Sequence, residues 1–61
     1  MTEVTFAEMK YAVVGWLNTA PAGFDKRAVQ ALLAVEGFSI AFRVERAYLY
    51  LLNKQLIDED D

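Results

Sequence analysis

Three segments of the chain place apolar residues at the spacing of an amphipathic α-helix. The first stripe consists of Phe6, Met9, Val13, Trp16 and Leu17. Just before it, Thr5 and Glu8 have the spacing of a capping box, in which each side chain accepts a hydrogen bond from the other residue's amide. We therefore predict a helix from Phe6 to Leu17 or Asn18, followed by a break in the segment 19–23, which contains proline and glycine.

The second segment predicts a helix that begins near Asp25. Aspartate is a good N-cap residue, and Phe24 before it has the position of a hydrophobic staple to Val29. The apolar stripe of this helix consists of Val29, Leu32 and Leu33. Gly37 stands where a left-handed residue commonly follows a helix end, and Phe38 would then contact Leu33. The second helix is therefore expected to end just before Gly37.

The third segment predicts the longest helix, from Ile40 to Gln55 or Leu56. Ser39 precedes it and is a favourable N-cap residue. One face is lined by Ile40, Val44, Ala47, Tyr48 and Leu51, and Leu52 and Leu56 widen it. Three helices with short connections leave little chain for a sheet. The predicted fold is therefore all-α, a compact three-helix domain over residues 1–57 followed by an acidic C-terminal tail over 58–61.

Composition adds the expectation of a partner. The chain has 61 residues and is 56% hydrophobic, above the 45–50% or so of ordinary soluble domains. A domain this small buries a limited fraction of its surface, so part of the apolar surface is expected to lie in an interface. Tyr11 and Val14 lie off the main stripe of the first helix, which makes them candidate interface residues of a homodimer.

The net charge of −3 hides an uneven distribution of charge. Asp58, Glu59, Asp60 and Asp61 supply four of the nine acidic residues. The remaining 57 residues carry five acids and six bases, so they are close to neutral. The sequence therefore describes a near-neutral domain with an acidic end.

The residue types present argue against catalysis and against bound cofactors or metals. The chain has no histidine and no cysteine, which are the commonest general base, nucleophile and metal ligands. A glycine-rich loop is also missing, so we expect a non-catalytic protein. No apolar run approaches the ~18 residues of a membrane span, and the first residues lack the basic start of a signal peptide, so we expect a cytoplasmic protein.

The segment 44–57 carries a resemblance to a known family. It reads Val-x-Arg-Ala-x-x-x-Leu-x-x-x-x-Leu-Ile, with matches at Val44, Arg46, Ala47, Leu51, Leu56 and Ile57. With Gly37, Phe38 and Ser39 before it, this pattern resembles the helix-turn-helix half of winged-helix DNA-binding domains. DNA-translocase gamma domains of the FtsK type look similar in length and order. Gln55 departs from the family, which has glycine there, and four acids stand where the wing would follow.

The resemblance implies a small regulatory DNA-binding protein that acts as a dimer, with its third helix in the major groove. The candidate DNA-binding residues are Lys26, Arg27, Arg43, Arg46, Tyr50, Asn53 and Lys54. The basic side chains would neutralise phosphates, while Asn53 or an arginine would touch a base edge. The alternative is an ordinary solvated face in which Arg43 or Arg46 pairs with Glu36 or Glu45.

An apolar triplet favours a second function. Ile40, Ala41 and Phe42 open the third helix, where DNA-reading helices usually carry Ser, Thr, Arg or Asn. Phe42 is either a core residue or, with Ile40, part of a protein-binding surface. The alternative function is therefore a protein-binding adaptor or inhibitor, such as the small phage-encoded proteins that block a host machine. A basic rim around Arg43 and Arg46 would favour DNA, and an apolar rim would favour a protein partner.

Overall fold

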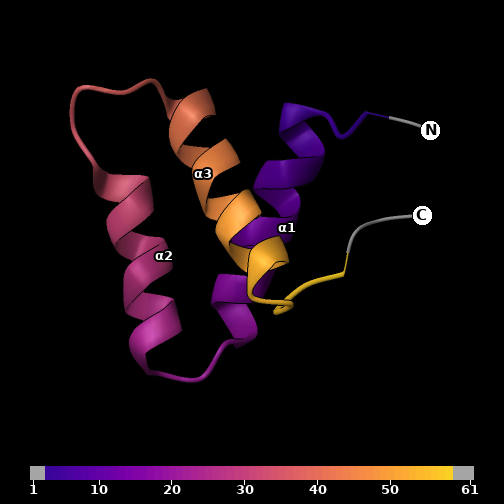
Figure 1. The fold of residues 1–61 in the computed structure, drawn as a ribbon, viewed down its shortest axis with the longest axis vertical. Helices are drawn as coiled ribbons and strands as arrows, with labels where there is room; N and C mark the ends of the chain where they lie inside the picture. Colours follow the sequence, from indigo (N-terminus) through magenta and orange to yellow (C-terminus); the bar gives the residue numbers. More distant parts are fainter. Residues whose placement is uncertain (1–2, 59–61) are drawn as a thin grey trace.

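The computed structural model describes residues 3–58, which form three α-helices and no strand (Figure 1). Helix α1 spans Phe6–Thr19, α2 spans Phe24–Ala34 and α3 spans Ile40–Asn53. The predicted all-α, three-helix fold is confirmed. Helix α3 ends two or three residues earlier than the apolar pattern predicted, and residues 59–61 of the predicted tail lie outside the described part of the chain.

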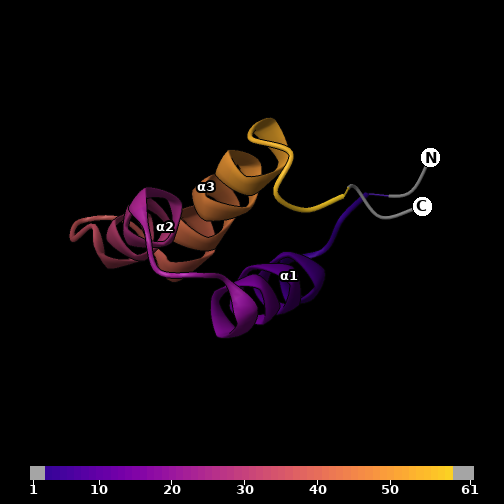
Figure 2. The same cartoon turned by 90° about the horizontal axis from the view of Figure 1, so that it is seen from below.

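Helix α3 is the central helix of the domain. It packs against both α1 and α2, whereas α1 and α2 contact each other little. In Figure 1, α2 and α3 run side by side in opposite directions, and α1 lies on the other side of α3. Figure 2 shows the connection between α2 and α3 on one side of the molecule and the start of α1 on the other. Two sides of α3 are therefore covered, and only one stripe faces solvent.

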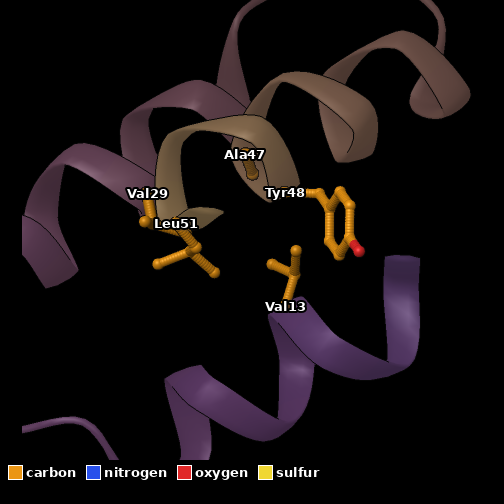
Figure 3. Packing of buried hydrophobic residues seen from close by; sticks show 5 residues of the cluster. All are labelled: Val13, Val29, Ala47, Tyr48 and Leu51. Atoms are coloured by element: carbon orange, nitrogen blue, oxygen red, sulfur yellow. The ribbon is translucent and has the colours of Figure 1, made fainter. Parts of the chain in front are cut away.

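The core is built from one residue each of α1 and α2 and several of α3. Figure 3 shows its members, which are Val13, Val29, Ala47, Tyr48 and Leu51. Val44 is buried as well, so most of the predicted stripe of α3 is confirmed. Ile40 was also predicted to lie on this face, but its side chain is 59% exposed. The first turn of α3 extends beyond the end of α2 in Figure 1, which leaves Ile40 in solvent.

The helix starts confirm two predicted caps and correct a third. Glu8 N donates to Thr5 Oγ1 at 3.2 Å and Thr5 N donates to Glu8 Oε1 at 2.9 Å, which completes the capping box. Ser39 Oγ accepts from Phe42 N at 3.1 Å. Asp25 is not an N-cap, because α2 begins at Phe24 directly after Gly23. Phe24 is therefore not a staple residue before the cap, and its ring is largely exposed.

The connection between α2 and α3 differs from the predicted one. Gly37 has a φ of +93°, in the left-handed region that was expected. Helix α2, however, ends at Ala34 with Val35 as its C-cap, one residue too early for Gly37 to occupy the predicted position. Phe38 stacks on the ring of Phe42, with 5.0 Å between ring centroids. The helix-to-helix connection is residues 35–39.

Helix α3 ends in a Schellman motif around Gln55. Leu56 N donates to Leu51 O at 2.9 Å, and Gln55 N donates to Leu52 O at 3.0 Å. These two bonds define the motif, in which the left-handed position is usually glycine. Gln55 takes it with a φ of +60°, at the position where the winged-helix pattern has glycine. Leu56 then packs against the core cluster and directs the chain back toward α1.

Candidate functional site

Two of the predicted DNA-binding residues are held by Asp25 in a cluster between α2 and α3. The hydroxyl of Tyr50 donates to Asp25 Oδ1 at 2.7 Å. Lys54 Nζ lies 3.9 Å from the same oxygen, in an ion pair between partly exposed side chains. The hydrogen bond to Asp25, together with desolvation and the negative charge of the carboxylate, raises the pKa of Tyr50 above its usual value. Asp25 thus joins the start of α2 to the end of α3.

Phe24 and Tyr50 add ring contacts to this cluster. Lys54 Nζ lies 5.9 Å from the centroid of the Phe24 ring and 5.6 Å from that of Tyr50. Both distances fall within the range of cation–π contacts. The half-exposed ammonium group of Lys54 therefore has one anionic neighbour and two ring contacts within the molecule.

The antiparallel arrangement of α2 and α3 divides the predicted DNA-binding set into two groups. Lys26 and Arg27 lie in the first turn of α2, next to Asp25 and therefore near Tyr50 and Lys54. Arg43 lies in the first turn of α3, at the opposite end of the helix pair. Arg43 therefore lies at the other end of the α2–α3 pair from Lys26 and Arg27.

Three residues of the set do share a surface hollow. Arg46, Tyr50 and Asn53 line a space of about 580 Å³ together with Leu32, Leu49 and Leu52. The side chains of α3 that face solvent include Phe42, Glu45, Arg46, Leu49 and Asn53. This exposed stripe is mixed in character, because it contains two large apolar residues and one acid. The exposure of Leu49 was not predicted from the sequence.

A second hollow surrounds the two arginines at the start of α3. It has a volume of about 290 Å³ and is lined by Leu32, Val35, Phe38, Phe42, Arg43 and Arg46. Phe38 is 49% exposed and Phe42 is 42% exposed, and their stacked rings are inclined by only 25°. The rim around the arginines is therefore apolar. The interpretation of Phe42 as a core residue is wrong, because the ring remains accessible at the surface.

Arg43 is left with an unsatisfied donor in this hollow. Its Nε atom is buried and has no hydrogen-bond acceptor within residues 3–58. The only ion pair among residues 3–58 is the one between Lys54 and Asp25. The predicted alternative pairing of Arg43 or Arg46 with Glu36 or Glu45 is therefore not formed there.

The interface candidates of α1 are also exposed. Tyr11 is 83% exposed and Val14 is half-exposed, as a docking role requires. The sequence interpretation missed Val35 and Phe38 as members of the surface next to Phe42. Phe38 and Phe42 are four residues apart across the start of α3. Residues at this spacing lie on the same side of a helix, so the sequence contained a signal that the two rings are neighbours.

Known proteins offer no guide to this surface. Comparison with protein families, with characterised proteins and with solved structures gave no match to the chain. Within residues 3–58, no three potential metal ligands of the His, Cys, Asp or Glu type gather at one place. The described helices are too short or too polar to cross a bilayer.

Proposed function

We propose that this protein is a protein-binding module that acts through the connection between α2 and α3. The binding surface, called the turn surface below, consists of Val35, Phe38, Ile40, Phe42, Arg43 and Arg46. The observation that supports this function is the apolar rim around Arg43 and Arg46. Binding itself is the proposed activity, as in an adaptor or an inhibitor.

The chemistry of the turn surface suits a protein partner. Its exposed aromatic and aliphatic side chains gain about 25 cal/mol for each Å² of apolar area that a partner covers. Arginine and aromatic residues are enriched at the energetic centres of protein interfaces. Beside apolar groups, an arginine forms strong paired hydrogen bonds with a carboxylate. A partner segment that combines apolar and acidic side chains would satisfy both parts of the surface.

The same features make duplex DNA a weaker candidate. DNA affinity depends mainly on basic side chains that neutralise phosphates. Beside Arg46 and Asn53, the exposed stripe of α3 presents Phe42, Glu45 and Leu49, and Glu45 would repel a phosphate. Antiparallel helices with a short connection form an αα-hairpin, whereas the helices of a DNA-binding helix-turn-helix cross at about 90–120°. DNA binding is therefore the competing outcome of the test.

A peptide-display experiment tests the proposal directly. A random-peptide library is selected against the wild-type protein, and the recovered peptides are synthesised with a fluorescent label for anisotropy measurements. We expect peptides that contain both apolar and acidic residues. Their binding should be lost in Phe42→Glu and weakened in Arg43→Glu/Arg46→Glu. Val14→Glu is the matched control, because it places the same charge at a half-exposed valine of α1.

A parallel titration uses labelled random duplex DNA at low salt. The proposal predicts no binding that depends on Arg43 and Arg46. It is overturned if the wild type yields no recurring peptide, binds the duplex with a steep salt dependence, and loses that binding in Arg43→Glu/Arg46→Glu.

A further inference from the structure

A third hollow, with a mainly apolar lining, lies where the start of α1 meets the end of the described chain. It has a volume of about 470 Å³, and its lining includes Val4, Ala7, Glu8, Tyr11, Tyr48 and Asp58. We call its exposed part, formed by Ala7, Glu8, Tyr11 and Asp58, the terminal surface. Tyr11 is the most exposed large apolar side chain of the described residues. The two charged groups of this surface are both acidic.

The turn surface and the terminal surface carry opposite charge. Arg43 and Arg46 line the hollow of the turn surface, and the exposed acids Glu36 and Glu45 lie outside that lining. The charged residues that line the hollow of the terminal surface are Glu8 and Asp58. Figure 2 shows the connection 35–39 and the start of α1 on opposite sides of the molecule. A single chain therefore cannot bring its two surfaces together, but two copies can.

We propose that the turn surface of one copy binds the terminal surface of a second copy. This inference rests on the proposed function, because it takes the turn surface as protein-binding and names its partner. Tyr11 of one copy stacks beside Phe38 and Phe42 of the next. Glu8 and Asp58 of the first copy face Arg43 and Arg46 of the second. Aromatic pairing and charge-assisted hydrogen bonds both contribute to such a contact.

Charge decides between this head-to-tail contact and a symmetric dimer. A symmetric dimer through α1, which the sequence suggested, would bring Glu8 and Asp58 of both copies together. A symmetric contact of two turn surfaces would bring four arginines together. Like charges across an interface are costly, and opposite charges set its orientation. Because each copy keeps one free surface of each kind, the association extends into an open chain or closes into a ring.

Two single substitutions test the two surfaces one at a time. Phe42→Glu removes the turn surface and Tyr11→Glu removes the terminal surface, and both positions are exposed helix positions where glutamate is compatible with folding. Sedimentation equilibrium of the wild type at low salt should show a mass that increases with protein concentration. Each variant alone should remain a monomer with an unchanged far-ultraviolet circular dichroism spectrum.

The mixture of the two variants is the decisive sample. Phe42→Glu retains a terminal surface and Tyr11→Glu retains a turn surface, so the equimolar mixture should form a dimer of one chain of each and no larger species. A second mixture, in which the double variant Arg43→Glu/Arg46→Glu is used instead of Phe42→Glu, should form the same dimer. High salt should weaken the dimer, because its charged groups are at the surface. Val14→Glu is the control, which should associate like the wild type.

Three outcomes would overturn head-to-tail association. They are a wild type that stays monomeric at every concentration, a Phe42→Glu variant that still self-associates, and a mixture that contains only monomers. A dimer that is lost in both Tyr11→Glu and Val14→Glu but kept in Phe42→Glu would indicate the symmetric contact through α1. None of these results affects the peptide selection, so the proposed function would be judged separately.

Discussion

The hydroxyl of Tyr50 donates a 2.7 Å hydrogen bond to Asp25, and this contact joins the end of α3 to the start of α2. The two residues are 25 positions apart in the sequence. With Lys54, they form the polar contact that fixes the open end of the α2–α3 pair, opposite the connection 35–39.

Tyr50→Phe should destabilise the domain slightly, because it removes one hydrogen bond to a partly exposed carboxylate. The measurement is the midpoint of urea unfolding followed by circular dichroism. Tyr11→Phe is the matched control, since that ring is exposed and its change should leave the midpoint unaltered. Equal effects of the two changes would argue against a stabilising bond to Asp25.

Stability should also decrease at high pH through the same hydroxyl. The pKa of Tyr50 is raised from 10.0 in the folded protein, chiefly by its hydrogen bond to Asp25. A raised folded-state pKa contributes stability that is complete below the unfolded value of about 10 and is lost as the pH rises through the folded value. Urea midpoints measured from pH 9 upward should fall less in Tyr50→Phe than in the wild type. Parallel curves would contradict this linkage.

Gln55→Gly should stabilise the domain by roughly 0.5–1 kcal/mol. A left-handed conformation costs a residue with a Cβ atom about 1–2 kcal/mol, and part of this gain is offset by the greater unfolded-state freedom of glycine. Thermal unfolding of the two proteins gives the difference. Gln30→Gly is the control, because the same change inside an exposed part of α2 should be destabilising by about 1 kcal/mol.

Leu51 and Leu49 offer a matched pair on α3. Leu51 is fully buried in the core, whereas Leu49 is about half exposed. Leu51→Ala should cost about 2–5 kcal/mol, which is a large part of the stability of a small domain. Leu49→Ala should change it by less than about 0.5 kcal/mol. Similar losses from both changes, measured by urea unfolding, would mean that the packing of α3 differs from the structure.

Removal of residues 58–61 distinguishes the two candidate partners by the sign of its effect. The truncation deletes four of the nine acids. If copies associate head to tail, the truncated protein should associate more weakly and its salt dependence should be flatter. If the protein binds duplex DNA, the truncated protein should bind more tightly, because repulsion from phosphates is reduced. Sedimentation and duplex anisotropy at the same salt concentrations measure both effects.

Local signals in the sequence were sufficient to predict most of the fold. The capping box of Thr5 and Glu8 and the cap at Ser39 depend on residues three positions apart, so the sequence contains both partners of each bond. The apolar period likewise identified Val13, Val29 and Leu51 as core residues. These features are set by backbone geometry and by short-range contacts.

The errors concern contacts between helices. Asp25 has the residue type of an N-cap, and its role as acceptor for Tyr50 depends on how α2 lies against α3. The sequence also did not show the neighbours of the predicted face of Arg43, Arg46, Tyr50, Asn53 and Lys54. Arg43 lies beside Phe38 and Phe42, and Lys54 lies beside Asp25. Periodicity shows which residues share a face of a helix. It does not show which neighbour covers that face, and Phe42 and Ile40 were ambiguous for this reason.

The Schellman motif at Gln55 has a consequence for circular permutation of the chain. It directs the chain so that Val4 and Asp58 line the same hollow, and a short flexible linker could therefore join the two ends. New ends opened in the segment 20–22 would give a circular permutant that begins with α2 and α3 and finishes with α1. Such a protein should keep the hairpin and its turn surface intact while the linker covers the terminal surface.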